Sequence, residues 1–336
     1  MLIDLHAHQI TKEMFNQDEH WGPFWHDGTL RIGDWVLGSK VYPGQPAKPG
    51  TVDELYDGHW APEPRLAAFD KAGIDKVVVS MPLHMVMYHT GAAFANRWAH
   101  TVNDSLAQWC STNPERFYFW AQVPMQDPQA AAKELERAVT ELGAQGISIG
   151  GANFGGREAH DPALYPVWEK ISELGVMVFV HGYNQSVTWG AKACDDPFDT
   201  TSIVGMNSDE TLFYWNLTNG GVLDDFPDLK ILITHGGGFV PFQLGRFNAT
   251  NKTMAPDSKN KKELIEYNSH FFYDLDIHSP IMRRAIIDEV GVDQMLYGDN
   301  FSGSDIHEGD LTEGLGLSPA DQDKIRSENA KPLLKL

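Results

Sequence analysis

Cysteine is scarce in this chain, and its scarcity excludes two kinds of protein. Only Cys110 and Cys194 occur among the 336 residues. Two cysteines cannot build the disulfide framework of a small secreted domain, and they cannot supply the thiolate cluster of a cysteine-based zinc module. Neither class of protein fits this sequence.

Long apolar runs and an excess of positive charge are also missing. No apolar run approaches the length of a membrane-spanning helix, and the N-terminus does not resemble a signal peptide. The chain carries 26 Lys and Arg against 46 Asp and Glu, a formal net charge of −20. This charge argues against nucleic acid or an anionic membrane as the main partner. We therefore expect a cytoplasmic enzyme.

From residue 61 onward, helical and strand patterns alternate along the chain. The apolar content of 42% is enough for a large core in a chain of this length. Helical spacing of apolar residues predicts helices at 64–72, 92–111, 128–142, 165–174, 210–226, 281–290 and from about 320 to the C-terminus. Uninterrupted apolar runs predict strands at 76–80, 117–123, 146–150, 176–181, 230–235, 271–275 and 294–299.

The N-terminal stretch from Leu2 to His8 adds one more strand, which makes eight. Eight buried parallel strands separated by helices are typical of a closed barrel. We predict an α/β fold, a (β/α)8 TIM barrel in one domain over residues 1–336, with long insertions after strands one and five at about 9–60 and 182–209. A doubly wound open sheet is the alternative, but the Gly-x-Gly-x-x-Gly signature that it would carry after the first strand is missing.

The insertion at 9–60 is predicted to be irregular, and it is rich in aromatic residues, among them Trp21, Trp25, Trp35 and Trp60. A structureless loop of this length inside a compact domain is unusual unless it is functional. One interpretation is that it covers a pocket and supplies aromatic contacts to a planar substrate. The other is a small hydrophobic cluster that only packs on the body of the domain, and the two are compatible.

The first strand carries a possible metal-binding pair. Side chains alternate between the two faces of a strand, so His6 and His8 project to the same side, roughly 6–7 Å apart along it. Two neutral imidazoles on a rigid strand suit Zn²⁺ or a similar divalent ion, with further ligands from elsewhere in the chain. A His-x-His pair alone also fits a strand with two surface histidines.

Three more polar residues end predicted strands of the same polarity. His181 ends strand five, His235 ends strand six and Asp299 ends strand eight. Each histidine alone could be a core residue bonded to a backbone carbonyl. In a barrel, however, the carboxyl ends of all strands share one rim, which is where the active sites of this fold lie. Together with the histidine pair of strand one, these residues predict a site at that rim.

These residues resemble the pattern of the amidohydrolase superfamily. The glycine run after His235 and the segment from Pro241 to Arg246 are similar to the branch that contains 2-amino-3-carboxymuconate-6-semialdehyde decarboxylase and γ-resorcylate decarboxylase. The segment from Trp98 to Pro128 resembles that branch as well. The resemblance covers nearly the whole chain and implies a (β/α)8 barrel with one catalytic divalent metal ion.

The resemblance also implies residue roles. His6, His8, His181 and Asp299 would be metal ligands, and His235 would be the acid/base residue beside the metal, with Asp299 counted among the catalytic residues. The expected ion is Zn²⁺, with Mn²⁺ as the alternative. Strand four offers no lysine of the kind that relatives with two metals carbamylate, so one ion is expected. Asp4 would hold a metal-bound histidine in place, or would simply lie inside the barrel.

The implied reaction is non-oxidative decarboxylation of an aromatic or enoic acid that bears an oxygen or nitrogen substituent next to the carboxylate. The alternatives are a hydratase or a metal-dependent hydrolase, such as one that cleaves a C–C bond of a meta-cleavage product, and, less in keeping with the ligand set, a non-catalytic metal-binding barrel. One departure concerns the loop after Asp299, which reads Asn-Phe-Ser-Gly where the decarboxylases commonly have an aromatic residue and proline.

Substrate contacts are less well defined by the sequence. Trp21 and Trp25 are candidates for contacts to a planar acid, and Arg246 is a candidate for orienting an anionic group. Arg246 could equally be a structural salt-bridge partner. Arg31 is a further candidate for a carboxylate contact, although a surface cation is the simpler reading. We expect a small-molecule carboxylic acid as the partner and a homodimer or homotetramer as the assembly.

Overall fold

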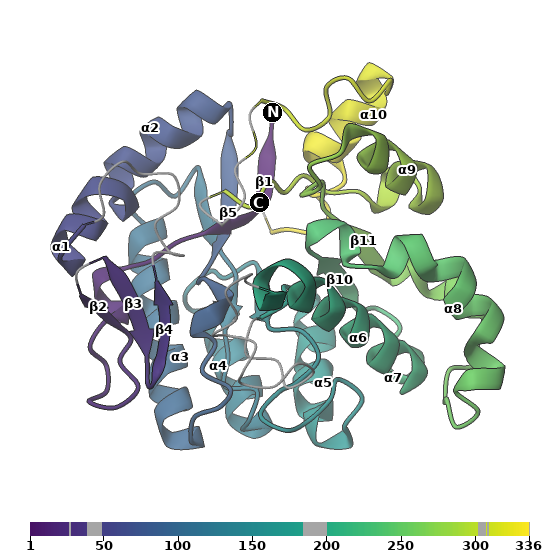
Figure 1. Ribbon diagram of the computed structural model, residues 1–336, viewed down its shortest axis with the longest axis horizontal. Helices are drawn as coiled ribbons and strands as arrows, with labels where there is room; N and C mark the ends of the chain where they lie inside the picture. The colour runs from purple at the N-terminus through teal and green to yellow at the C-terminus, as the bar shows by residue number, and fades with distance from the viewer. Residues whose placement is uncertain (27, 39–48, 184–199, 302–306, 308, 336) are drawn as a thin grey trace.

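The computed structural model describes residues 1–26, 28–38, 49–183, 200–301, 307 and 309–335. Its central strands are surrounded by helices, and the N-terminal strand lies inside the molecule (Figure 1). The predicted barrel of the α/β class is confirmed. Most of the second predicted insertion, at 182–209, lies outside the described residues, so its structure stays a prediction.

The barrel strands run parallel to their neighbours. In order around the barrel they are β1 Ile3–His8, β5 Lys76–Ser80, β6 Phe117–Phe119, β7 Ala121–Gln122, β8 Gly146–Ile149, β9 Met177–Val180, β10 Lys230–Ile233 and β11 Phe271–Tyr273. The strand predicted at 117–123 is divided between β6 and β7. At the break, the N–H of Trp120 donates to the carbonyl of Val79 at 2.9 Å, so the chain keeps its place between its neighbours.

The expectation of a regular eighth strand at 294–299 is wrong. This segment and the residues after it make isolated bridges in place of a ladder: Met295 bridges to Tyr273 of β11, and Phe301 bridges to Ala7 of β1. Without a continuous ladder of hydrogen bonds there is no regular strand. The two bridges nevertheless close the barrel between β11 and β1, so the segment occupies the eighth position.

The helices follow the strands in the order expected for this fold. They are α1 Val52–Leu55, α2 Pro62–Ala72, α3 Ala92–Cys110, α4 Pro128–Thr140, α5 Tyr165–Leu174, α6 Met206–Asn219, α7 Val222–Asp225, α8 Val240–Met254, α9 Pro280–Val290 and α10 Pro319–Asp323. Most of the predicted helices begin and end within a few residues of these bounds. None of the helices in the described part of the chain combines the length and the apolar character needed to cross a bilayer.

Three helical regions differ from the prediction. The helix expected at 210–226 is divided into α6 and α7, because Gly221 adopts a left-handed φ of 80° between them. Helix α8 was not predicted, because Pro241 and a glycine obscure its pattern, although proline is tolerated in the first turn of a helix. The helix expected from about 320 to the C-terminus ends as α10 at Asp323 and continues only as a π-helical turn at Lys324–Glu328.

The first insertion is more regular than predicted. It contains a three-stranded antiparallel sheet of β2 Phe24–His26, β3 Thr29–Ile32 and β4 Trp35–Gly38, drawn in purple beside the barrel (Figure 1). The strands are short and rich in β-branched and aromatic residues, and glycines with positive φ lie in the turns between them. The expectation of an irregular segment is therefore wrong for residues 24–26 and 28–38.

Large aromatic side chains fill the inside of the barrel. Trp120 is fully buried, and its indole stacks on Phe179 of β9 with ring centroids 5.7 Å apart. Its Nε1 donates to the carbonyl of Leu5 in β1 at 3.1 Å, which satisfies the polar end of the indole inside the core. This packing and hydrogen bond hold β1 in place, and with it the two histidines at the carboxyl end of the strand.

Candidate metal centre

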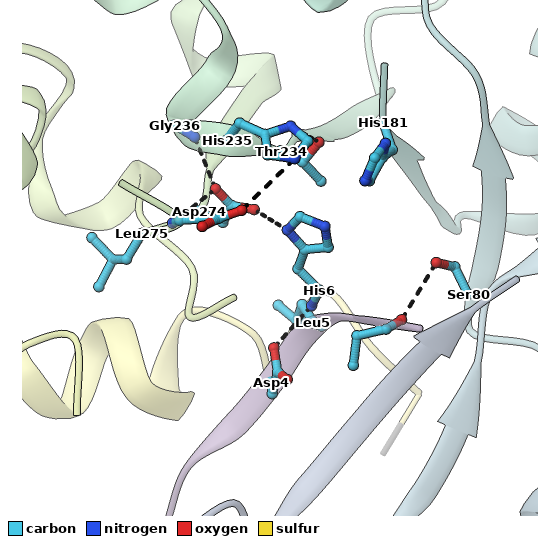
Figure 2. Close-up of polar contacts among 12 residues, drawn as sticks. Asp4, Leu5, His6, Ser80, His181, Thr234, His235, Gly236, Asp274 and Leu275 are labelled. Carbon is cyan, nitrogen blue, oxygen red and sulfur yellow. Dashed lines mark hydrogen bonds and ion pairs between the residues drawn. The ribbon is translucent and has the colours of Figure 1, made fainter. Parts of the chain in front are cut away.

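The two histidines of β1 lie at its carboxyl end, as predicted, and each is held by a polar partner. His6 Nδ1 lies 2.8 Å from Oδ2 of Asp274, and His8 Nδ1 lies 3.0 Å from Oγ of Ser80. Both imidazoles are buried, with ring centroids 5.4 Å apart. Because these partners occupy the Nδ1 atoms, the Nε2 atoms remain to bind a ligand. Figure 2 shows His6 with its partner Asp274.

His181 joins this pair from the end of β9. Its Nδ1 lies 2.6 Å from the carbonyl of Gly182, which again leaves Nε2 for another partner. One ligand atom from each of His6, His8 and His181 lies within 4.8 Å of the other two. The structure thus brings together three of the four residues that the sequence suggested as metal ligands.

The environment keeps two of these imidazoles neutral. Burial lowers the pKa of His8 and of His181 well below the ordinary histidine value, and the neighbouring histidines lower both further. A metal ion binds the neutral imidazole through its lone pair, so no proton has to be removed from these side chains at neutral pH.

Asp299, the fourth predicted ligand, follows the segment that closes the barrel. Its carboxyl faces that of Asp4. Within the described part of the chain, Asp299 belongs to no set of three or more residues whose ligand atoms all lie within 4.8 Å of one another. Burial is the main cause that raises the pKa of Asp299 to about 6, whereas the hydrogen bond with Asp4 opposes that rise. Burial, and then the charge of Asp299, also raise the pKa of Asp4 well above its ordinary value.

Several buried polar atoms at this rim suit a cation. Nε2 of His6 and Oδ1 of Asp299 are buried and have no hydrogen-bond partner among the described residues. Burying such atoms without a partner costs about 1–3 kcal/mol each. A divalent ion would give such an atom a partner, and imidazole and carboxylate are ligands that Zn²⁺ and Mn²⁺ accept. The residues at this rim therefore fit a divalent metal ion.

His235 follows β10 and lies between two carboxylates. Its Nδ1 is 2.6 Å from Oε1 of Glu210 in α6, and its Nε2 is 3.7 Å from Oδ2 of Asp276. Burial alone would lower the pKa of His235, but Glu210, Asp276 and Asp274 together raise it to about 10. The ring lies 4.7 Å from that of His181, measured between centroids. The carboxylates around His235 thus favour its protonated form, next to the three-histidine set.

The backbone at His235 is strained. Its φ is 52°, a left-handed value that non-glycine residues rarely adopt and that costs of order 1–3 kcal/mol. The three glycines that follow also have positive φ, and a Cβ at Gly237 would lie only 2.4 Å from the Tyr273 ring. The glycine run therefore lets the chain turn tightly against β11 and point the imidazole of His235 into the rim.

A buried arginine supports the end of β1 from outside the histidine set. Arg65 of α2 has no exposed surface, and its Nη2 donates to the carbonyl of His8 at 2.9 Å. Its guanidinium lies over the rings of Trp60, Phe69 and Phe301 at 4.7–5.2 Å from their centroids. Arg65 therefore fixes the backbone next to a predicted metal ligand.

Sequence reasoning missed the carboxylates that hold the histidines. Asp274 and Asp276 directly follow β11, so the rule that polar residues at strand ends share one rim would have found them. Glu210 lies within α6, where no strand-end pattern marks it, and Oε1 of Glu210 also accepts from the N–H of Gly182 at 2.9 Å. The strand-end rule predicted the histidines as metal ligands, but the carboxylates that hold those histidines were not predicted.

The residues suggested as substrate contacts lie in the first insertion and in α8. Trp21 contacts His89 with ring centroids 4.9 Å apart, and Trp25 is buried with its Nε1 bonded to the carbonyl of Pro49 at 3.0 Å. Arg246 lies on an exposed part of α8. Arg31, in β3, is exposed as well. Their roles toward a substrate stay predictions.

An imidazole-rich centre at the carboxyl rim of a (β/α)8 barrel defines a class of metal-dependent barrel enzymes. Within that class, this chain belongs to the amidohydrolase family, whose model matches residues 3–336. The family membership agrees with the resemblance that the motifs at His6, His8, His181 and His235 suggested. The match to the family model covers nearly the whole chain.

Individual relatives narrow the comparison. The chain is 32% identical over 284 residues to a γ-resorcylate decarboxylase of Polaromonas sp., covering 81% of this chain and 86% of the relative. It is 29% identical over 308 residues to a 2-amino-3-carboxymuconate-6-semialdehyde decarboxylase of Dictyostelium discoideum, covering 89% and 81%. A solved dihydroxybenzoic acid decarboxylase of Polaromonas sp. with bound manganese matches with a TM-score of 0.75 at 24% identity, covering 99% and 96% of the two chains.

Proposed function

We propose that this protein is a metal-dependent, non-oxidative decarboxylase of an aromatic or enoic carboxylic acid with an oxygen or nitrogen substituent next to the carboxylate. The observation that carries the proposal is the position of His235 beside the three-histidine set, with ring centroids 4.7 Å from His181 and 5.2 Å from His6. Loss of CO₂ requires a proton donor next to a centre that withdraws electrons. The decarboxylases among the relatives support the same reaction.

The chemical problem is the electron pair that CO₂ leaves on carbon. A bound divalent ion would withdraw electron density through the neighbouring substrate oxygen, an effect worth several kcal/mol. His6, His8 and His181 are proposed to hold that ion, with Asp299 as the fourth ligand. The substituent next to the carboxylate would give the substrate a second oxygen or nitrogen atom with which to contact the ion. Two such contacts would define the orientation of the substrate.

His235 is the proposed general acid. Glu210 holds its Nδ1 at 2.6 Å, and the Asp276 carboxylate that faces Nε2 is 3.7 Å away, beyond hydrogen-bond distance, so Nε2 can still donate to the substrate. The proton on Nε2 passes to the carbon that loses CO₂, and His235 takes up a proton from water before the next turnover. A positioned general acid of this kind typically contributes 10²–10⁴-fold to a rate.

The identity of the ion is a separate part of the proposal. Three imidazoles and a carboxylate suit Zn²⁺, which we propose as the resident ion. Mn²⁺ is the alternative, supported by the manganese in the solved dihydroxybenzoic acid decarboxylase. Elemental analysis of purified protein, followed by activity measurements after reconstitution with each ion, distinguishes the two.

The surroundings of the site complete the proposal. Trp21 and Trp25 are proposed to contact a planar substrate, and Arg246 to orient an anionic group. We also propose a cytoplasmic location and a homodimer or homotetramer. Light scattering of the purified protein measures the assembly directly, and Arg246→Gln would raise KM if the arginine contacts the substrate.

The central experiment incubates the metal-loaded protein with a panel of hydroxybenzoates, aminobenzoates and muconate-type acids. Release of CO₂ and the matching decarboxylated product are followed together. We expect stoichiometric CO₂ and product for at least one acid. Conversion without CO₂ would contradict the proposal and favour a hydrolase or hydratase.

Substitution of His235 tests the mechanism. His235→Asn keeps a polar side chain of similar size and His235→Ala removes it, and neither can donate an imidazolium proton. Both variants should retain metal and lose about 10²–10⁴-fold in kcat. Turnover within about threefold of the parent in both variants, well short of that loss, would refute the role of His235.

A further inference from the structure

Asp276 connects His235 to a second histidine outside the metal centre. The Asp276 carboxylate is buried, and its Oδ1 lies 2.7 Å from Nε2 of His307. Its other oxygen, Oδ2, lies 3.7 Å from Nε2 of His235 and has no hydrogen-bond partner among the described residues. One carboxylate therefore faces both imidazoles.

The direction of each hydrogen bond in this group is fixed by chemistry. Nη2 of Arg283 lies 3.0 Å from Nδ1 of His307. A guanidinium only donates hydrogen bonds, so Nδ1 of His307 accepts and Nε2 of the same ring carries the hydrogen. His307 therefore donates to Asp276, and the carboxylate is left with its second oxygen turned toward His235.

The far end of the group is anchored to the barrel. Arg283 lies in α9 and is mostly buried, and its Nε donates to the carbonyl of Leu275 at 3.1 Å, just beyond β11. The side chain of His307 is only 4% exposed. The ring of His278 stacks on it with centroids 4.2 Å apart. These contacts leave His307 and Asp276 little freedom to turn.

We propose that Arg283, His307 and Asp276 form a directed hydrogen-bond chain that positions the imidazole of His235. Asp276 is the residue that faces His235, and His307 and Arg283 are positioning residues that act through it. Glu210 bonds to Nδ1, and the charge of Asp276, 3.7 Å from Nε2, orients the other edge of the ring without a hydrogen bond that would occupy Nε2. This inference rests on the proposed role of His235 as the proton donor.

Two other readings of the same residues fit less well. Ligand atoms of Asp276, His278 and His307 lie within 4.8 Å of one another, a spacing that a metal ion could use. Both ring nitrogens of His307 are already occupied, however, one by a guanidinium cation that repels a metal ion. A proton relay from solvent through His307 is blocked for the same reason, because Nδ1 accepts from Arg283 and cannot take a proton without losing that bond.

A pair of substitutions at His307 tests the proposal. His307→Gln offers an amide oxygen to Arg283 and an N–H to Asp276, so it can keep the direction of the chain. His307→Leu fills a similar volume and breaks both bonds. In the zinc-loaded protein we expect His307→Leu to lower kcat about tenfold with KM and zinc content unchanged, and His307→Gln to stay within about threefold, effects of the size of one hydrogen bond.

The carboxylate is tested by Asp276→Asn. The amide oxygen can still accept from His307, but the amide N–H₂ would meet the donor edge of His235. We expect a loss in kcat at least as large as that of His307→Leu. Because His307 acts through Asp276, adding His307→Leu to Asp276→Asn should cost little more, which a double-mutant cycle measures as strong coupling. Fully additive losses would overturn the proposal.

A readout that does not depend on turnover separates this proposal from the proposed reaction. In zinc-loaded protein with ¹⁵N-labelled histidine, the ring signals of His235 should shift or broaden in His307→Leu and stay as in the parent in His307→Gln. If no acid is decarboxylated but this pattern is found, the reaction is wrong and the chain stands. If both variants leave His235 unchanged, or both lose zinc, the proposed chain is wrong.

Discussion

His6 and Asp274 form a fully buried pair, with Nδ1 of the imidazole 2.8 Å from Oδ2 of the carboxylate. The other oxygen of Asp274 accepts from the N–H of Gly236 at 2.9 Å, at the start of the glycine run after His235. One aspartate therefore holds both a predicted metal ligand on β1 and the backbone that carries the proposed proton donor. Figure 2 shows this carboxylate between the two segments.

The first prediction concerns this aspartate. Asp274→Ala removes the acceptor that orients His6, and we expect metal affinity to fall about 10–100-fold, as for other residues that orient metal ligands. Asp274→Asn keeps an acceptor without the charge and should lose less. Competition with a chelator measures the affinity, and Asp228→Asn, at an exposed position, is the control. An affinity within about twofold of the parent, well short of that loss, would contradict this role.

The second prediction concerns removal of the metal ion. We expect purified protein to carry about one divalent ion per chain, and a chelator to lower Tm by several degrees, because a ligand at 1,000 times its Kd stabilises the native state by about 4 kcal/mol. His181→Ala should hold much less metal and should lose the sensitivity of Tm to the chelator. Two ions per chain, or a Tm that is unaffected in the parent, would refute the single-ion centre.

The barrel itself was readable from the sequence because buried parallel strands are continuous apolar runs. The run at 230–235 and the helix at 165–174 were placed almost to the residue. A regular strand was wrongly predicted at 294–299, because a run of apolar residues can close a barrel without a continuous ladder of hydrogen bonds. Helix α8 was missed because Pro241 and Gly245 interrupt its pattern and its apolar residues form no clear stripe.

The candidate site was also predictable only in part. His6, His8 and His181 were found because strand ends point to one rim, a rule that needs only sequence order. Glu210 and Arg65 reach the site from helices, and no local pattern marks a helical residue that bends toward a strand end. Asp299 was placed near the rim, but its pairing with Asp4 depends on how the closing segment meets β1. Sequence order does not contain that information.

The third prediction concerns the glycine run. Gly237→Ala would place a Cβ 2.4 Å from the Tyr273 ring, at a φ of 82°. Strain and overpacking together should lower the free energy of unfolding by about 2–4 kcal/mol. Gly245→Ala in the exposed part of α8 meets nothing within 4 Å and should be neutral or stabilise by about 0.5–1 kcal/mol. Equal stabilities of the two variants in urea would rule out the tight turn.

The fourth prediction concerns acid stability and His59. This half-buried histidine lies in the turn before Trp60, and burial, with a smaller contribution from the charge of Arg65, lowers its pKa to about 4. The unfolded chain has a histidine pKa of about 6.5. Between these values the unfolded state binds more protons than the folded state, so the free energy of unfolding falls as the pH falls.

The size of this effect follows from the two pKa values. Between pH 7.5 and pH 5, His59 should remove about 2 kcal/mol or less from the free energy of unfolding, since part of its ring is exposed. His59→Gln cannot titrate, so it should lose that much less stability than the parent over the same interval. Urea unfolding at both pH values measures the difference, with His20→Gln at an exposed position as the control. Parallel losses in the parent and in His59→Gln would mean that the folded protein binds a proton at His59 as readily as the unfolded chain.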